Sequence, residues 1–403
     1  MRPHLVKIRQ SKNLLICLNS QMEKLPKIYY VANLRFPTEK AHGIQLAKMC
    51  EAFLDGAADL QLVIPGRRSI SESPKEFYGL KYSIPTKKLP ILDIYSWGRL
   101  GFTLASLSFA VCYFLYLLRK KMKGERFIVY TIDMDQFSFF LVPCIGVPYF
   151  VEVHDAKRKN FFYSFLFKNA KGVIVINQLI KETLIKEFKL TPDKIIVHSN
   201  GIDLKQFDIA VSYSEARQKL WLPLDRHIAL YVGKVYDWKG MEILVDAAPN
   251  LDANTYLYLV GATESELHKI GNGKLVANMV CVGQRDYKEI PLWLKAADVL
   301  LVLGTKQNEY SYYHTSPMKM FEYMASRTLI VASKTPAVMQ AVSDAEVVFY
   351  EPDNSKDLAE KIRYVLQNSL ETSEKINNAF AKVTNLTWQK RANSIINFIT
   401  ENI

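Results

Sequence analysis

The sequence predicts two successive α/β domains, each built on a parallel sheet with helices on both faces. Its 403 residues are enough for two domains that each have a core. Short apolar runs alternate with helical patterns, as is typical of parallel strands joined by helices. This alternation stops after Asn200-Gly-Ile-Asp, a turn signal, and restarts at His227. We therefore expect a cleft between the domains, with a ligand at the carboxyl ends of the strands.

The expected elements follow in order along the chain. The first strand, 27–33, leads through a loop to a helix over 44–54. Further strands of the first domain are expected at 60–64, 127–131, 148–153, 172–176 and 194–197. A polar connection near 205–225 precedes the strands of the second domain at 227–232, 256–260, 279–282, 299–302, 328–332 and 346–349. We divide the chain into an N-terminal extension (1–26), a first domain (27–210), a second domain (211–385) and a C-terminal helix (386–403).

The charge of the chain is concentrated in its first half. Residues 1–210 contain 31 basic and 18 acidic side chains, a net charge of +13, whereas residues 211–403 contain 21 and 22. A basic half favours phosphates or an anionic membrane surface as partners. No basic tract contains interleaved aromatic residues in an RNA-binding pattern, so nucleic acid is not an expected partner.

The five cysteines are scattered without metal-ligand spacing, which favours a reducing compartment and argues against a disulfide framework or a zinc site. The N-terminus lacks the pattern of a signal peptide. We therefore expect a cytoplasmic protein.

Residues 100–118 hold no charge over 19 positions, and the basic cluster 119–123 follows them. Three interpretations stay open: a buried crossover helix, an interfacial helix resting on lipid, and a membrane span, for which about 20 residues are needed. A span is the least favoured, because strand 127–131 must join the same sheet a few residues later.

The second domain contains a candidate anion site. Ser316 followed by Pro317 is typical of a helix start, and the free backbone N–H groups of that start would face residues 312–316. Glu322 lies inside this helix, where its carboxylate could accept hydrogen bonds from both hydroxyls of a ribose. A solvated or salt-bridged helix glutamate is the alternative interpretation.

The loop after strand 227–232 adds positive charge at the same sheet edge. Gly233 allows a close turn, and Lys234 and Lys239 could neutralise a diphosphate. Exposed lysines without a ligand would give the same pattern.

The first domain offers two polar segments to the cleft. His154 and Asp155 follow the apolar run of strand 148–153, where a donor or acceptor would face a ligand. The loop that contains His42 and Gly43 brings a second helix N-terminus to the same edge. The alternatives are a structural histidine and an ordinary loop between a strand and a helix.

Together these segments resemble the retaining glycosyltransferases of the GT-B fold, in particular family 4, from residue 27 to the end. The resemblance rests on Glu39-Lys-Ala-His-Gly-Ile-Gln, His154-Asp155, Asn200-Gly-Ile-Asp-Leu-Lys-Gln-Phe, Tyr231-Val-Gly-Lys, Lys239-Gly, Leu259-Val-Gly, Cys281-Val-Gly and Ser316-Pro-Met-Lys-Met-Phe-Glu-Tyr-Met-Ala, in this order. It implies two Rossmann-like domains, with a nucleoside-diphosphate sugar bound by the second domain and an acceptor bound by the first.

The resemblance also implies roles for individual residues. The catalytic set would be His154 beside the transferred sugar, Lys234 and Lys239 at the diphosphate, and Glu322 at the ribose. The loop 283–287 would hold the nucleobase, and His42 with Gly43 would form the acceptor or diphosphate loop. The implied donor-binding residues are Gly233, Gly283, Arg285, His314, Thr315, Ser316, Pro317 and Met318.

The implied reaction proceeds with retention and without a metal or other cofactor. One residue departs from the family pattern: His314 stands where the first of two motif glutamates is expected. An imidazole cannot replace a bidentate carboxylate acceptor, so the sugar is not predicted.

The leading hypothesis is a hexosyltransferase of envelope or exopolysaccharide synthesis, peripheral on the inner face of the cell membrane and acting on a glycan or lipid-linked acceptor. Residues 100–123 would make the membrane contact. The alternatives are a nucleotide-sugar epimerase and a non-catalytic partner subunit that binds a nucleotide-sugar.

Overall fold

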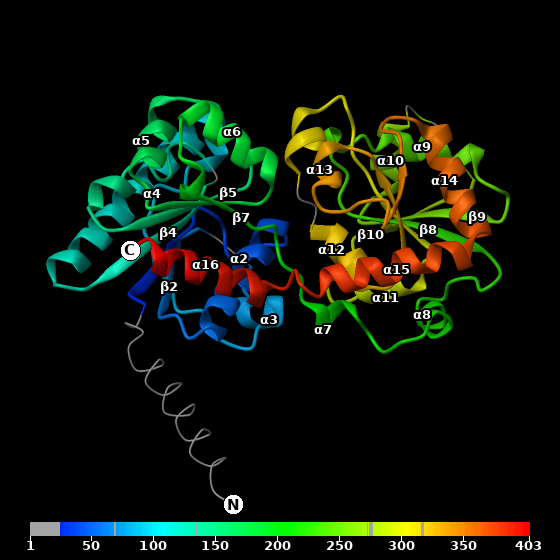
Figure 1. Cartoon of the computed structure of the whole chain (residues 1–403), viewed down its shortest axis with the longest axis horizontal. Helices are drawn as coiled ribbons and strands as arrows, with labels where there is room; N and C mark the ends of the chain where they lie inside the picture. The colour runs from blue at the N-terminus through cyan, green and yellow to red at the C-terminus, as the bar shows by residue number, and fades with distance from the viewer. Residues whose placement is uncertain (1–24, 68–69, 134, 272, 274–276, 316–317) are drawn as a thin grey trace, which may run out of the picture.

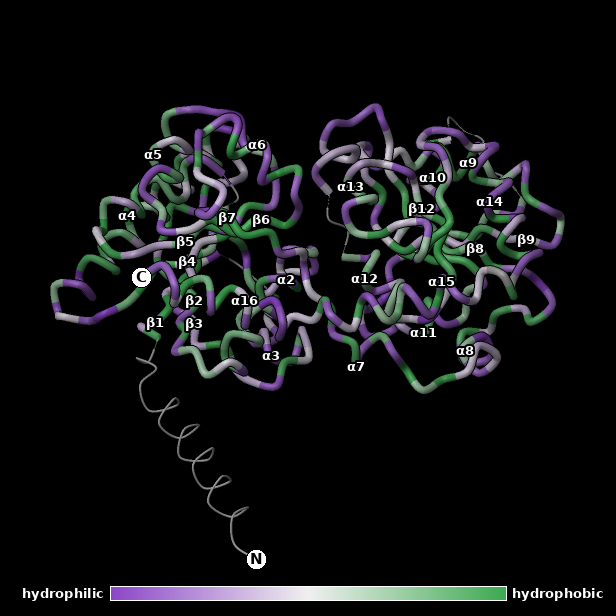
Figure 2. Tube along the Cα trace, in the orientation of Figure 1, coloured by the Kyte–Doolittle hydropathy of each residue, from purple (hydrophilic) through white to green (hydrophobic). Residues whose placement is uncertain are grey.

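Two α/β lobes lie side by side in the computed structural model (Figure 1). The structure describes residues 25–67, 70–133, 135–271, 273, 277–315 and 318–403. Most of the expected N-terminal extension, 1–26, therefore lies outside the described residues. Hydrophobic residues gather on the strands at the centre of each lobe (Figure 2).

The first lobe contains a seven-stranded parallel sheet in the order β3-β2-β1-β4-β5-β6-β7. Its strands are β1 (Lys27–Val31), β2 (Leu60–Pro65), β3 (Thr86–Leu89), β4 (Phe127–Asp133), β5 (Tyr149–Val153), β6 (Gly172–Val175) and β7 (Ile195–Val197). Six of them were predicted; the polar edge strand β3 was not. Short 3-10 turns are η1 (Tyr95–Trp97), η2 (Val142–Ile145) and η3 (Pro192–Lys194).

Helices cover both faces of this sheet. One face packs against α2 (Ala41–Asp55), α3 (Pro74–Tyr78) and the last helix, α16 (Trp388–Glu401). The other packs against α4 (Gly98–Met122), α5 (Phe161–Asn169) and α6 (Gln178–Phe188). The expected helix 44–54 thus begins three residues earlier, at Ala41.

The second lobe contains a six-stranded parallel sheet in the order β10-β9-β8-β11-β12-β13. Its strands are β8 (His227–Val232), β9 (Thr255–Val260), β10 (Met279–Gly283), β11 (Val299–Val302), β12 (Leu329–Ser333) and β13 (Val348–Tyr350). All six were predicted, β8 and β11 with the observed bounds and the other four with shifted ends.

Two groups of helices cover the second sheet. One face packs against α7 (Leu204–Phe207), α11 (Ile290–Ala296), α12 (Met318–Ala325), α13 (Pro336–Met339) and α15 (Ser369–Val383). The other packs against α9 (Glu242–Ala247), α10 (Glu264–Ile270) and α14 (Ser355–Gln367). Shorter turns are η4 (Asp237–Lys239), η5 (Ala248–Asn250) and the π-helical η6 (Tyr310–His314).

The expected polar connection near 205–225 contains helices. Besides α7, it forms α8 (Tyr213–Lys219). The side chain of Ser212 accepts a hydrogen bond from the backbone of Glu215, and the Glu215 side chain accepts one from the Ser212 backbone. This reciprocal capping stabilises a helix too short to show an apolar period.

Helix α4 is the crossover between β3 and β4. Phe109, Tyr113 and Leu117 are buried on the face that packs on the sheet. By length and composition the segment Tyr95–Met122 could cross a membrane, but 39% of its most apolar window is buried in the fold. Residues 100–118 thus form a crossover helix that is only partly buried, and the interfacial interpretation stays a prediction. Its opposite face exposes apolar side chains such as Leu115, which is 58% exposed.

The chain passes between the lobes twice, and the two crossings touch. The backbone N–H of Ile202 donates to Leu386 O at 2.9 Å, and Ile202 forms an isolated parallel bridge with Thr387. Helix α16 then returns to the first lobe, where Trp388 and Phe398 enter its core beside α2. The predicted C-terminal helix therefore packs on the first lobe, and the boundaries at 210 and 385 stay a proposal.

Candidate functional site

The carboxyl end of β8 is where the predicted diphosphate site lies. Gly233 follows the strand with φ +150°, and a Cβ atom there would lie 1.6 Å from Lys319 Nζ. A Cβ atom would therefore displace the ammonium group of Lys319, which comes from helix α12, and the positive φ itself favours glycine.

Lys239 and Lys319 meet beside this glycine. Lys239 Nζ lies 3.3 Å from the hydroxyl of Tyr231, and Lys319 Nζ lies 5.2 Å from the centre of the same ring. Burial, with the charge of Lys319 adding to it, lowers the pKa of Lys239 to about 6. Burial also lowers the pKa of Lys319 to about 8, although the charge of Glu322 acts in the opposite direction. Among the described residues neither lysine forms an ion pair with a carboxylate, so the pair is suited to an anion.

Lys234, the second lysine expected at the diphosphate, is exposed on the loop after Gly233. Its charge is among the influences that lower the pKa of Glu39 in the first lobe, after a hydrogen bond from the backbone of Glu39 itself. The structure therefore pairs Lys239 with Lys319, which the sequence did not single out, rather than with Lys234.

Glu322 is buried inside α12, at 5% exposure, and not solvated as the alternative interpretation had it. Its Oε1 accepts a hydrogen bond from the Tyr287 hydroxyl at 2.8 Å. Burial raises the pKa of this carboxyl group, while Tyr287 and Lys319 lower it. Tyr287 lies at the end of the predicted base-binding loop, and its bond to Glu322 joins that loop to the predicted ribose site.

The start of the base-binding loop contacts the loop after β9. Gly283 has φ +76°, its N–H donates to Ala262 O at 3.1 Å, and its carbonyl accepts from Gly261 N at 2.7 Å. Arg285 is exposed beyond it.

His314 is buried where the lobes meet. It ends η6 at 9% exposure, its carbonyl lies 3.4 Å from Asn177 Nδ2 of the first lobe, and its buried Nδ1 has no hydrogen-bond partner among the described residues. Thr315 N donates back to Tyr310 O at 3.1 Å, and Met318 packs against the core of the first lobe. Ser316 and Pro317 lie outside the described residues, and so does the predicted cap.

A pocket of about 540 Å³ lies between the lobes beside His314. Residues of both lobes line it, three of them basic and three acidic. The lining residues are Asp155, Ala156, Lys157, Arg158, Lys159, Thr183, Glu187, Glu309, Tyr310 and His314. The predicted cleft therefore has polar walls of mixed charge where Asp155 follows β5.

His154 and His42 are partly buried in the first lobe, and the side chain of His154 is 24% exposed. His154 Nε2 lies 2.5 Å from Glu152 Oε1. Burial, together with the charge of Lys40, lowers the pKa of His42 to about 4, so this imidazole is neutral at pH 7.

Gly43 has a packing reason to be glycine. A Cβ atom there would lie 2.5 Å from both Thr38 Cγ2 and the Tyr78 hydroxyl. That hydroxyl donates to Thr38 O at 2.7 Å. The close neighbours of a Cβ atom at Gly43 thus belong to its own lobe, and the approach of Gly43 to a diphosphate stays a prediction.

Comparison with known proteins agrees with this architecture. Residues 212–383 match the family described as glycosyl transferases group 1. An uncharacterized glycosyltransferase of Methanocaldococcus jannaschii is 25% identical over 56% of this chain and 58% of its own length. The N,N'-diacetylbacillosaminyl-diphospho-undecaprenol alpha-1,3-N-acetylgalactosaminyltransferase of Campylobacter jejuni is 25% identical over 58% of this chain and 62% of its own. The chain thus spans less than two thirds of either relative.

Among solved structures, Alr3699/HepE of Anabaena in complex with UDP superposes with a TM-score of 0.71 at 18% identity, covering 93% of this chain and all of that one. This likeness confirms the predicted fold. The chain has the GT-B fold, and its residues 212–383 match the family described as glycosyl transferases group 1.

Proposed function

We propose that the protein is a glycosyltransferase that takes a sugar from a nucleoside-diphosphate sugar bound by the second lobe. The observation that supports this most is the meeting of Lys239 and Lys319 near the carboxylate of Glu322. Two ammonium groups would neutralise a diphosphate, and Glu322, already bonded to Tyr287, would accept from the ribose. Arg285 and the loop around it would contact the base.

The proposed reaction keeps the configuration of the transferred sugar. The bond from the anomeric carbon to the diphosphate oxygen breaks, and a bond to the acceptor oxygen forms on the same face. The departing phosphate oxygen takes the proton of the acceptor hydroxyl, so no protein nucleophile is needed. Lys239 and Lys319 would stabilise the charge that develops on the diphosphate.

We propose that these lysines make a divalent metal unnecessary. Among the residues that the structure describes, no group of three or more His, Cys, Asp or Glu could hold a metal ion. Transfer should therefore continue in the presence of EDTA.

The proposed acceptor is a lipid-linked glycan, bound by the first lobe at the inner face of the cell membrane. The charge of +13 on residues 1–210 suits a phosphate-bearing acceptor, and the exposed apolar face of α4 suits lipid. The Campylobacter relative is named for a diphospho-undecaprenol acceptor, which agrees with this proposal.

The direct test incubates the protein with a panel of nucleotide-sugars, with and without polyprenyl-diphosphate sugars, in EDTA and in Mg²⁺. We expect a glycosylated lipid product with one donor, in either condition, and NMR of the product should show the anomeric configuration of the donor. A sugar altered without acceptor would instead support an epimerase. Donor binding without turnover on any acceptor would support the non-catalytic subunit.

A further inference from the structure

Glu152 is a fully buried charge in the middle of β5. Four side chains from four other positions surround its carboxylate. Arg391 Nη2 donates to Oε1 at 2.9 Å, Gln45 Nε2 donates to Oε1 at 2.8 Å, and the Tyr130 hydroxyl donates to Oε2. The fourth is His154, whose Nε2 lies 2.5 Å from Oε1.

The proton between Glu152 and His154 can be assigned. Burial alone would raise the pKa of the Glu152 carboxyl, but the charge of Arg391 and the bonds from His154 and Tyr130 outweigh burial and hold the pKa well below its usual range. An ionised carboxylate only accepts hydrogen bonds, so Nε2 of His154 must carry the proton. In the neutral imidazole, Nδ1 is then left as an acceptor.

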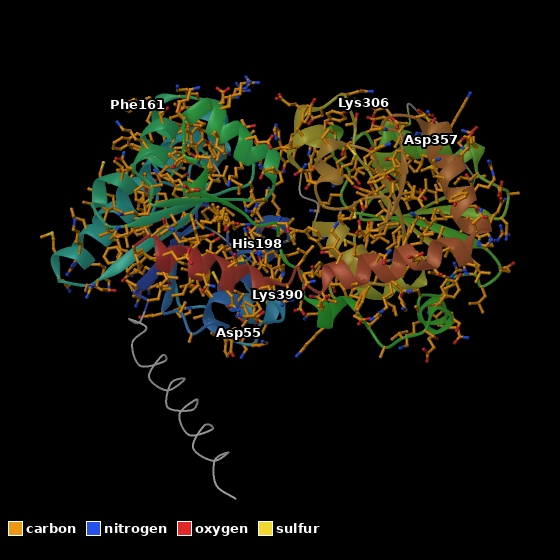
Figure 3. All side chains as sticks on the ribbon, viewed as in Figure 1. Asp55, Phe161, His198, Lys306, Asp357 and Lys390 are labelled. Carbon is orange, nitrogen blue, oxygen red and sulfur yellow. The ribbon has the colours of Figure 1, made fainter. Side chains whose placement is uncertain are left out.

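Arg391 connects the side chains around Glu152 to the C-terminal helix α16. It is fully buried on α16, and its Nε also donates to Ser199 O at 3.0 Å, just after β7. The neighbouring residues His198 and Lys390 lie on the flank of the first lobe nearest the second (Figure 3). Helix α16 thus contacts β5, the strand directly before His154.

We propose that Glu152 is a positioning residue of the transfer site, which fixes His154 in the Nε2–H tautomer so that Nδ1 accepts a hydroxyl of the transferred sugar, and that Arg391 secures Glu152 from α16. This inference rests on the proposed place of His154 beside that sugar. Stability alone does not require the arrangement, because a buried ion pair is often replaceable by apolar residues without loss of stability.

The first measurement needs no substrate, and a variant serves only to assign the signals. In ¹⁵N-labelled wild type, with the His154 signals assigned by their absence in His154→Asn, the neutral imidazole should show a protonated Nε2 and an unprotonated Nδ1. The opposite tautomer, or a rapid average of both, would overturn the proposal even if transfer were never detected. A protein with the expected tautomer and no transfer activity would instead count against the proposed function.

The second measurement separates positioning from stability. Glu152→Gln alone leaves Arg391 buried without its partner and is expected to destabilise the fold. The double variant Glu152→Gln/Arg391→Met removes both charges at similar volume. It should fold and bind the donor nucleotide as the wild type does, lose the single tautomer, and transfer the sugar roughly 10- to 100-fold more slowly, the value of one hydrogen bond to a charged group.

A matched control replaces another buried arginine together with its carboxylate partner. Arg217 Nη2 and Asp298 Oδ2 lie 2.6 Å apart in the second lobe, and Arg217 is fully buried like Arg391. The variant Arg217→Met/Asp298→Asn should keep the wild-type kcat. If both double variants slow transfer equally, or neither slows it, Glu152 has only a structural role and the proposal fails.

Discussion

Two lysines of unequal charge state are the most distinctive feature of the site at the scale of single residues. With a pKa of about 6, Lys239 is mostly neutral at pH 7, whereas Lys319, with a pKa of about 8, is mostly charged. A bound diphosphate favours the charged form of both and raises both pKa values. Binding should therefore take up protons at pH values above about 6, and affinity should fall as the pH rises.

The proton uptake can be measured by calorimetry of a nucleoside diphosphate in two buffers of different ionisation enthalpy. At pH 8 we expect the observed binding enthalpy to differ between the buffers in the sense of net uptake. Lys239→Met should reduce this uptake, and the exposed Lys234→Met should leave it unchanged. Equal enthalpies in both buffers would show that the lysines do not change their charge.

Diphosphate binding should depend more on Lys319 than on Lys234. A hydrogen bond to a charged group contributes about 1.5–3 kcal/mol, so Lys319→Met should weaken diphosphate binding about tenfold or more. Lys234→Met should weaken it less, because Lys234 is exposed. Equilibrium titration of both variants checks this order, and the reverse order would restore the assignment made from the sequence.

Lys319 is an example of a site residue that could not be identified from the sequence. Glu322 and Lys239 stand out because a strand end or a helix start marks their position. Lys319 and Tyr287 give no such signal: one is an ordinary lysine of a helix, the other a tyrosine in a loop. Only the folded chain brings Lys319 against Gly233 and the Tyr287 hydroxyl to Glu322.

Secondary-structure elements were predictable in proportion to their burial. The central strands are continuous apolar runs, and β5 is buried at all five positions. Strand β3, Thr-Lys-Lys-Leu, lies at the sheet edge with two exposed lysines, so it has no apolar run to detect. The short helix α8 depends on the capping of Ser212 and Glu215.

Helix α4 gives a prediction at the scale of an element. Val111 and Leu115 are 48% and 58% exposed, and the basic cluster 119–123 lies at the same helix end. The wild type should cosediment with vesicles that contain anionic lipid, and Val111→Glu/Leu115→Glu should abolish this at an unfolding free energy within about 0.5 kcal/mol of wild type.

Two controls belong to the vesicle experiment. Leu224→Glu changes a similarly exposed leucine, 56% exposed, in the second lobe and should leave cosedimentation intact. Phe109→Ala, on the buried face of α4, should lower the unfolding free energy by about 3–5 kcal/mol. If the double variant sediments like the wild type, the exposed face of α4 is not a lipid contact.

At the scale of the whole molecule, the arrangement of the lobes depends on the contact between the two segments that connect them. A Cβ atom on Gly201 would lie 2.6 Å from the backbone nitrogen of Trp388, and backbone cannot move aside as a flexible side chain can. The turn signal at 200–203 was visible in the sequence, but the contact with residues 386–388 was not, because it joins segments far apart in the chain.

Gly201→Ala should therefore lower the unfolding free energy by about 1–3 kcal/mol, the usual cost of overpacking. Denaturant unfolding checks the value. Gly56→Ala is the matched control, because its nearest neighbour is Ile396 Cδ1 at 3.1 Å, the end of a flexible side chain. Equal stability of the two variants would mean that the crossings are not held together as described.

The central claim, a nucleotide-sugar site in the second lobe, is tested most directly by calorimetry of a panel of nucleoside diphosphates and nucleotide-sugars. We expect the nucleotide of one base to bind the wild type. Glu289→Ala is the control and should bind the same nucleotide equally tightly, because Glu289 is an exposed carboxylate near Tyr287. Glu322→Ala should bind it about tenfold or more weakly. If no nucleotide binds, or if Glu322→Ala binds as tightly as the wild type, the donor site is not where the account places it.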